Sequence, residues 1–317
     1  SYAVTGSLTS QTNVSCFGGS NGAISVQLTG GTPLYNYSLN GGAFTPTATF
    51  TGLSAGTYVV TLRDSKGCTD FVSTTVTQPD QLSVVIDVVN GATCFGATDG
   101  EIFITVNGGT SPYSYLWSNG TTLQDATGLA TGTWTVTITD NNGCTTTTGA
   151  SVGQPLNLVV SLASAQNLSC FNDSTGRIDI SVSGGIPAYQ YAWSNGAVSE
   201  DLTNLHAGTY TVTVVDANLC QKVLTQIITE PALLTASISG TNVSCNGGTG
   251  SIDLSPSGGT TPYAFLWNNG ATTEDISGIT SGTYSVLITD AKGCSISRSI
   301  VITQPAALSL SIASNNV

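Results

Sequence analysis

The chain has 317 residues, of which 40% are hydrophobic and only 8% are charged, and its formal net charge is −12. With 6 Lys and Arg residues against 18 Asp and Glu residues, it lacks the clustered positive charge that binds phosphates, so we expect no nucleic acid partner. No apolar run approaches the roughly 18 residues of a membrane span, so we expect no membrane insertion by this segment.

A repeat of about 75 residues organises the chain. Each unit ends in a Gln-Pro or Glu-Pro pair, and the prolines of these pairs are Pro79, Pro155, Pro231 and Pro305. We therefore predict four domains, at residues 1–79, 80–155, 156–231 and 232–305. Residues 306–317 are similar to the start of the third unit, and we interpret them as the first strand of a following repeat. The absence of Met and of a signal peptide suggests a segment of a longer secreted chain.

The second repeat illustrates the first half of the predicted elements. Residues 82–89 predict a strand that leads toward a cysteine. Residues 100–106 alternate between apolar and polar side chains, as a half-buried strand does. Residues 113–117 predict a third strand with its aromatic side chains on one side.

The second half of the repeat continues the same pattern. Asn119 is followed by glycine, which is a strong signal for a two-residue hairpin. Residues 121–129 predict a short irregular strand, residues 134–139 alternate cleanly, and residues 144–152 predict the last strand. No segment has helical periodicity with caps, so the sequence predicts an all-β fold of small immunoglobulin-like β-sandwiches.

Aromatic residues recur at two places in the repeat. A tyrosine opens the penultimate strand where immunoglobulin-like folds carry a tyrosine corner, at Tyr58, Tyr210 and Tyr284. Trp134 stands at that place in the second repeat and lacks the hydroxyl. The aromatics of the third strand are interpreted as core residues: Tyr115, Trp117, Tyr191, Trp193 and Trp267. The alternative is a platform that binds sugars.

Residues with catalytic potential are scarce. His206 is the only histidine and lies on a predicted turn, and no Ser/His/Asp set or phosphate-binding loop is present. We therefore predict no enzyme, no catalytic residues and no cofactor. An aspartate four residues before the second cysteine recurs at Asp64, Asp140, Asp216 and Asp290. We interpret it as binding the backbone of its own hairpin, with a calcium ligand as the alternative.

Four motifs recur together and carry a family resemblance. Cys-x-Gly-x-x-x-Gly precedes Gly-Gly-x-x-Pro-Tyr-x-Tyr-x-Trp-x-Asn-Gly, and Gly-Leu-x-x-Gly-Thr-Tyr-x-Val-x-Val-x-Asp-x-x-Gly-Cys follows before Thr-Gln-Pro. The combination resembles the SprB repeat family, and its hairpin and Gly-Thr-Tyr strand are similar to PKD domains. The first repeat departs from the pattern at Leu39 and the third at Asn204. The fold prediction is therefore a tandem array of four immunoglobulin/PKD-like β-sandwiches.

The resemblance also implies a function. SprB repeats occur in very large surface adhesins of gliding Bacteroidota that the type IX secretion system exports. The resemblance implies an extracellular, cell-surface stalk or filament that acts in gliding motility and surface attachment. Such a stalk would transmit force between cell and surface. Neighbouring repeats would be its partners, with surface polysaccharide or an external substratum as further candidates. The alternatives are carbohydrate-binding repeats and accessory PKD-like modules of a secreted hydrolase.

Eight cysteines, two in each repeat, predict disulfides in an oxidising compartment. Free buried thiols are an alternative. A zinc site is disfavoured, because no Cys-x-x-Cys motif exists and the paired cysteines lie far apart in sequence.

The order of strands in an immunoglobulin-like sandwich bears on the pairing. The first cysteine would follow the first strand at one end, and the second would lie at the other end, roughly 30 Å away. A disulfide needs Cα atoms within about 7 Å, and the repeats join almost without a linker. We therefore favour pairs between repeats, namely Cys16 with Cys144, Cys94 with Cys220, and Cys170 with Cys294. Cys68 and Cys245 would then pair with flanking repeats. Pairs inside each repeat remain the alternative.

Overall fold

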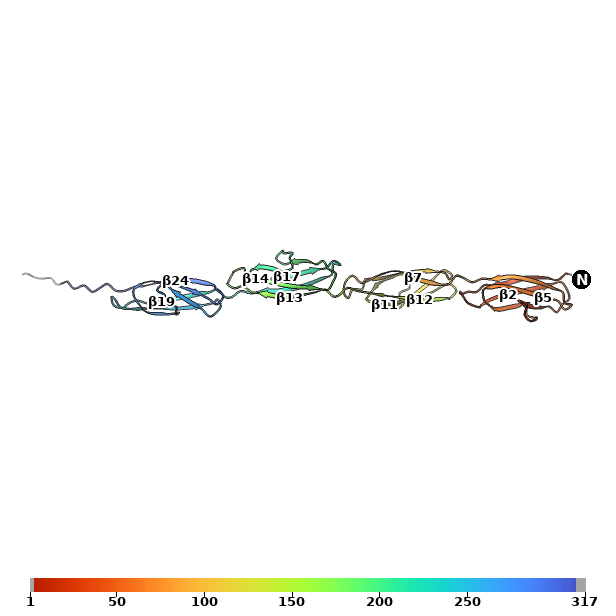
Figure 1. The fold of residues 1–317 in the computed structure, drawn as a ribbon, viewed down its shortest axis with the longest axis horizontal. Helices are drawn as coiled ribbons and strands as arrows, with labels where there is room; N and C mark the ends of the chain where they lie inside the picture. The colour runs from red at the N-terminus through yellow and green to blue at the C-terminus, as the bar shows by residue number, and fades with distance from the viewer. Residues whose placement is uncertain (1–2, 312–317) are drawn as a thin grey trace, which may run out of the picture. The chain divides into compact units, whose positions relative to one another are not determined.

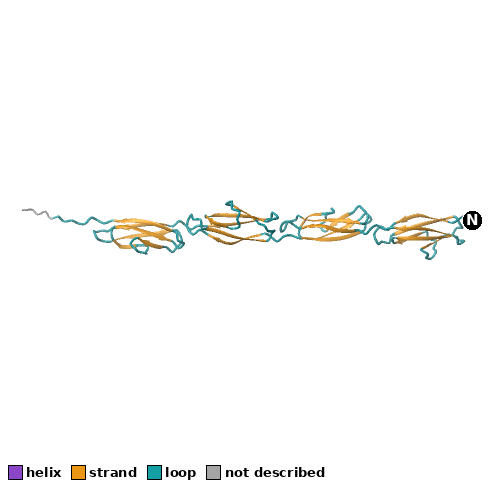
Figure 2. Cartoon of the chain, turned by 45° about the horizontal axis from the view of Figure 1, so that its top comes forward, coloured by secondary structure: helices purple, strands orange, loops and turns teal. Residues whose placement is uncertain are grey.

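The computed structural model describes residues 3–311, and every regular element within them is a β-strand (Figure 1). The chain divides into two compact units, Ser1–Pro155 and Leu156–Val317. Each unit contains two repeats, and each repeat has its own buried apolar cluster. Figure 2 shows the same composition, with strands joined by loops. The fold is thus all-β, in repeats of about 75 residues.

The strands of the first unit are β1 (Thr5–Thr12), β2 (Gly22–Thr29), β3 (Asn36–Leu39), β4 (Thr49–Leu53), β5 (Gly56–Arg63), β6 (Thr69–Val76), β7 (Ser83–Asn90), β8 (Gly100–Asn107), β9 (Ser114–Trp117), β10 (Ala126–Leu129), β11 (Gly132–Thr139) and β12 (Thr145–Val152). The second unit has β13 (Val159–Gln166), β14 (Gly176–Ser183), β15 (Gln190–Trp193), β16 (Leu202–Leu205), β17 (Gly208–Val215), β18 (Gln221–Ile228), β19 (Thr235–Thr241), β20 (Gly250–Ser257), β21 (Ala264–Trp267), β22 (Ile276–Ile279), β23 (Gly282–Thr289) and β24 (Ser295–Ile302).

Each repeat is a sandwich of two three-stranded antiparallel sheets. In the first repeat the strand orders are β1-β2-β4 and β3-β5-β6, and the other repeats follow the same scheme. Alternation of side chains produces this packing, because every second residue of a strand points to the same face. In β5, for example, Val60 and Leu62 are fully buried, while the alternate residues Thr61 and Arg63 are partly exposed.

The predicted core aromatics lie in or beside these clusters. Trp117, Trp193 and Trp267 are at most 5% exposed, and each indole N–H donates a hydrogen bond to a backbone carbonyl of the following loop. Tyr115 and Tyr191 are half-buried against the same clusters. The third-strand tryptophans therefore contribute to the core and are not available to bind a sugar on the surface.

The tyrosine corner is formed in three repeats and replaced in one. The hydroxyls of Tyr58, Tyr210 and Tyr284 donate to backbone carbonyls four residues upstream at 2.9–3.0 Å. Trp134 makes the equivalent bond, because its indole Nε1–H donates to the carbonyl of Ala130 at 3.0 Å. Trp134 lacks the hydroxyl, as the sequence indicates, but the second repeat still has a side-chain bond to the carbonyl four residues upstream.

The two cysteine positions lie at opposite ends of a repeat. The backbone N–H of Val14 donates to the carbonyl of Thr77, so the Cys16 turn lies beside the end of β6. Cys68 directly precedes the first residue of β6. Because β6 has eight residues, these ends are separated by about 26 Å. A disulfide within the repeat is therefore out of reach.

Residues 306–317 were expected to form the first strand of a following repeat. Residues 312–317 lie outside the described part of the chain. Residues 306–311 are described and are not assigned to a strand. That expectation stays a prediction.

Candidate functional site: the joints between repeats

The hairpin that carries the second cysteine is organised by a buried aspartate. In the first repeat, Asp64 is 3% exposed, and its Oδ1 accepts hydrogen bonds from the backbone N–H groups of Lys66 and Cys68. Its Oδ2 accepts a third bond, from the N–H of Thr32 in a neighbouring loop. Asp140, Asp216 and Asp290 make the same three bonds in their repeats. The aspartate therefore fixes where the cysteine lies.

These hydrogen bonds stabilise the ionised carboxylates. The N–H of Thr32, followed by other backbone donors, lowers the pKa of Asp64 below its ordinary value. For Asp216 and Asp290, burial raises the pKa, but backbone donors outweigh it and the net shift is downward. Each carboxylate already accepts three backbone bonds, which favours the structural interpretation of this column over a calcium ligand.

A glycine makes room for each of these carboxylates. Gly31 has a φ of +63°, and a Cβ atom built on it would lie 2.7 Å from Oδ2 of Asp64. Gly109, Gly185 and Gly259 have the same relation to their aspartates. The second glycine of each Gly-Gly pair is therefore required by both its backbone conformation and the close approach of the carboxylate.

The turn that carries the first cysteine is held by the residue before the closing proline. Oε1 of Gln78 accepts a hydrogen bond from the N–H of Gly18 at 2.8 Å. Gln154, Glu230 and Gln304 accept equivalent bonds from their own turns. From the sequence, these Gln/Glu-Pro pairs predicted only the repeat boundaries. Their fixed place in every repeat, each of which also has a first cysteine, was the signal for this second role.

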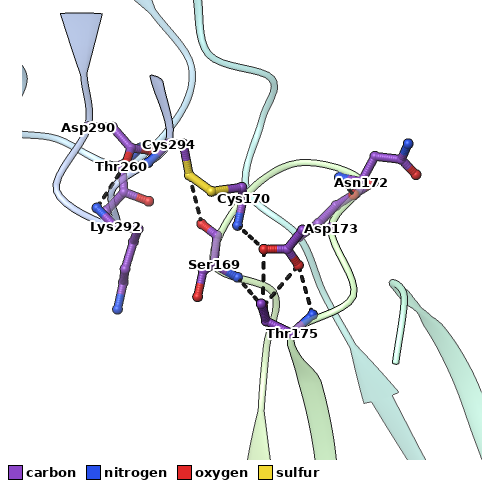
Figure 3. Close-up of a disulfide and its surroundings, with 10 residues drawn as sticks. Ser169, Cys170, Asn172, Asp173, Thr175, Thr260, Asp290, Lys292 and Cys294 are labelled. Atoms are coloured by element: carbon purple, nitrogen blue, oxygen red, sulfur yellow. Dashed lines mark hydrogen bonds between the residues drawn. A yellow bond between two sulfur atoms is a disulfide. The ribbon is translucent and has the colours of Figure 1, made fainter. Parts of the chain in front are cut away.

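Disulfides join the two kinds of cysteine position across a joint. In the first unit Cys16 is bonded to Cys144, with Cα atoms 5.8 Å apart. In the second unit Cys170 is bonded to Cys294, with Cα atoms 5.6 Å apart (Figure 3). These bonds leave no place for the alternative pairs inside a repeat. Among the other cysteines, Cys94 and Cys220 are each disulfide-bonded, whereas Cys68 and Cys245 are free and exposed.

Polar contacts support both disulfides. The carbonyl of Ser15 accepts a hydrogen bond from the side-chain amide of Asn142 at 2.9 Å and lies 3.4 Å from Sγ of Cys144. In the second unit the carbonyl of Ser169 lies 3.3 Å from Sγ of Cys294, as Figure 3 shows. The backbone carbonyl before the first cysteine therefore faces the hairpin of the next repeat.

A hollow beside each disulfide is lined by both repeats. In the first unit Cys16 and Phe17 line it together with Leu82 and Cys144 of the next repeat. In the second unit Cys170 and Phe171 line it together with Leu234 and Cys294. The joint therefore combines a covalent bond, an aromatic side chain and the apolar start of the next repeat.

His206, the histidine that the sequence places on a turn, has a structural role through its backbone. Its carbonyl accepts a hydrogen bond from the hydroxyl of the Tyr210 corner. Within residues 3–311 no cluster of three or more His, Cys, Asp and Glu side chains could hold a metal ion. The same residues include no helix long and apolar enough to cross a bilayer.

The fold and the joints define the class of protein as a tandem array of immunoglobulin-like β-sandwiches. A sequence model of the SprB repeat matches the chain four times, at residues 8–44, 87–122, 162–198 and 237–272. The chain is therefore an SprB-like repeat protein. No match was found among curated proteins.

Several solved structures are similar to the chain. The immunoglobulin domains 1–5 of Sidekick-1 share 13% identity, with 95% of this chain and 77% of that chain covered and a TM-score of 0.31. Invasin, a bacterial integrin-binding protein, shares 14% identity over 95% and 79% of the two chains, with a TM-score of 0.34. The human desmocollin-1 ectodomain shares 12% identity over 98% and 81%, with a TM-score of 0.27.

Proposed function

We propose that this chain is a stalk segment of a large bacterial cell-surface adhesin and that it transmits force without catalysis. The SprB repeats and the disulfides support an extracellular, adhesin-like segment. Gliding motility, surface attachment and export by the type IX secretion system belong to the proposal through the family. The observation that carries the mechanical role is the position of the disulfides at the joints.

The disulfides shorten the covalent path that a pulling force follows. In the first unit the path enters along β1, crosses from Cys16 to Cys144, and leaves along β12. In the second unit it follows β13, crosses from Cys170 to Cys294, and leaves along β24. Strands are already nearly extended, so they lengthen little under load. The other strands of each sandwich lie off the path and carry no tension.

Each disulfide keeps a long stretch of chain off the path that carries the force. The sequence separation of Cys16 and Cys144 is 128, so the loop would measure roughly 450 Å if fully extended. The loop between Cys170 and Cys294 spans 124 positions, or roughly 430 Å. A chain without these bonds would release most of that length as its repeats unfold. With them, the stalk keeps its reach under load.

Single-molecule pulling from the two termini tests this function. In oxidising buffer we expect stretching without the sawtooth of unfolding repeats. A reductant should restore unfolding events of about 75 residues each, or roughly 260 Å of extended chain. Unfolding of repeats at the same low force in both buffers would contradict the proposal.

A double variant isolates one joint. Cys16→Ser with Cys144→Ser places β2 to β11 on the covalent path, so unfolding events of the first unit that the parent lacks are expected in oxidising buffer. The matched control is Cys68→Ser, which removes a free, exposed cysteine and should leave the pulling curve unchanged.

A glycan array on the same protein tests the alternative function, carbohydrate binding. Reproducible binding to a glycan would favour that alternative.

A further inference from the structure

The first repeat carries a hollow at the end that holds Cys68. Its volume is 440 Å³, and it is lined by Ala3, Val4, Gly31, Thr32, Asp64, Lys66 and Cys68. Val4 stands two residues before Gly6, the strand partner of Leu28, and corresponds to Leu82 and Leu234 in later repeats. The hollow therefore lies at the place where the second and fourth repeats form their joints.

At the corresponding places of the second and fourth repeats, a turn from the preceding repeat lines the hollow. Cys16 and Phe17 line the hollow at Leu82, and Cys170 and Phe171 line the hollow at Leu234. Next to each, the second cysteine is bonded to the cysteine of that turn. The hollow at Cys68 has the same hairpin and the same buried aspartate, and its cysteine is free.

The apolar side chain at the start of the repeat is more buried at a joint than beside Cys68. Leu82 is 9% exposed and Leu234 is 5% exposed at their joints, whereas Val4 remains only half-buried. Lys66 lies at the hairpin position of Asn142, whose amide donates to the carbonyl before Cys16. An ammonium group on Lys66 can donate to a carbonyl in the same way.

The structure also contains a free turn of the matching kind. The Cys245 turn is closed by a bond from the N–H of Gly248 to the carbonyl of Cys245, at 2.9 Å. The side chain of Gln304 accepts from the N–H of Gly247, as Gln78 does for the Cys16 turn. The Cys245 turn is therefore already in the conformation that the bonded turns have.

We infer that the hollow at Cys68 is a docking site for the cysteine turn of another SprB repeat, and that Cys68 closes a disulfide with that turn. Its partner is a repeat with a free first-position cysteine, and the Cys245 end of this chain is such a partner. The inference rests on the proposed stalk function and extends it, because each end of the chain becomes half of a further joint.

The covalent step requires an oxidant. Two thiols lose two protons and two electrons as the sulfur–sulfur bond forms, and a small-molecule disulfide such as oxidised glutathione takes them up and becomes two thiols. Docking precedes this step and raises the effective concentration of the two thiols.

A tandem protein tests the inference with whole chains. Residues 1–305 followed directly by residues 2–317 place Val4 of the second copy three residues after Pro305, as Leu82 follows Pro79. After equilibration in a glutathione buffer, we expect two free thiols per tandem protein, where independent copies would keep four. Peptide mapping should link Cys245 of the first copy to Cys68 of the second. Four free thiols, or links without this preference, would overturn the inference.

Matched variants separate docking from proximity along the chain. Val4→Ser in the second copy removes apolar contact in the hollow, and Lys66→Glu replaces a donor by an acceptor at an exposed position. Each should lower the equilibrium constant for the new disulfide several-fold, while Lys222→Glu on the exposed part of β18 should not. Equal equilibrium constants for all three variants would mean that the two thiols pair only because the chain tethers them, and this would refute the docking site. This readout is independent of the pulling curves, so it can fail while the stalk function holds.

Discussion

At the residue scale, Gly31 and Asp64 form the contact that shapes the cysteine hairpin. Gly31→Ala introduces a Cβ atom 2.7 Å from Oδ2 of Asp64 on a backbone with a φ of +63°. We expect the first repeat to lose about 2 kcal/mol of unfolding free energy, from left-handed strain and from the displaced carboxylate. Chemical denaturation of the whole protein, monitored at the first repeat, measures this loss.

Gly41→Ala is the matched control for that substitution. Gly41 has a φ of +76°, and no heavy atom lies within 4 Å of a Cβ built there. We expect Gly41→Ala to lower the free energy of unfolding by about 1 kcal/mol, from the strain of a left-handed backbone alone. The difference between the two variants is therefore the cost of displacing the Asp64 carboxylate. If both variants lost the same stability, the close contact would have no energetic consequence.

The hairpin aspartates also predict how stability depends on pH. The pKa values of Asp64, Asp216 and Asp290 are lowered in the folded chain. A lowered folded pKa contributes stability above the unfolded value of about 3.9, and this contribution is lost as pH falls through the folded pKa. We expect the melting temperature to stay level from neutral pH to about 5 and to fall below about 4.

The control for the pH profile is Asp216→Asn, measured over the same range. The variant keeps an acceptor but presents an amide N–H to a backbone donor, so its repeat should melt several degrees lower at neutral pH. It should also show a shallower fall in acid than the parent protein. A fall of equal steepness in both proteins would assign the acid sensitivity to other carboxylates.

At the scale of elements, the turn before β2 and the end of β6 act together. Oε1 of Gln78 holds the turn of Cys16 through the N–H of Gly18. Gln78→Ala should loosen this turn, so that the bond between Cys16 and Cys144 opens at a less reducing glutathione ratio. We expect a several-fold lower equilibrium constant for that disulfide, measured by quantitative peptide mapping.

Gln304→Ala serves as the matched control for the turn. It removes the equivalent bond to Gly247, but the turn it affects carries the free Cys245. The bond between Cys16 and Cys144 should therefore keep its parent equilibrium constant. If both variants changed that bond equally, the effect would not come from the local hydrogen bond.

The strands themselves could be predicted from the sequence because their signals are local. Alternation placed β8 and β11 within a residue or two, and the glycines and asparagines marked the turns between strands. The four repeats were visible because the chain repeats its cysteines and prolines. These patterns depend on neighbours in the sequence, and a single chain contains them in full.

The joint could be predicted only in part, because its contacts are distant in sequence. The strand order of an immunoglobulin-like sandwich indicated which cysteines cannot meet. It did not indicate that Gln78 holds the cysteine turn, or that Phe17 lines a hollow with Leu82. The bond of Trp134 was not predicted either, because the sequence shows only that the tyrosine hydroxyl is missing and not that an indole N–H donates to the same kind of carbonyl.

At the scale of the whole molecule, the kind of bond that joins neighbouring repeats determines whether a chelator or a reductant loosens the joints. Within residues 3–311 the joint inside each unit is crossed by a disulfide, and no cluster of three or more potential metal ligands is present. A calcium-dependent array would loosen on addition of a chelator, since ions would hold its joints. We expect a chelator to leave the melting temperature and hydrodynamic radius of this protein unchanged.

A reductant should have the opposite effect on the same two measurements. Each loop of more than 100 residues restricts the unfolded chain by up to about 5 kcal/mol on the loop-entropy model, so reduction should lower the melting temperature. Freed joints should also alter the hydrodynamic radius, because only the chain itself then connects neighbouring repeats. The Cys16→Ser and Cys144→Ser double variant should show part of the reductant effect without reductant. A chelator effect as large as the reductant effect would mean that bound ions, and not the disulfides, stiffen the joints.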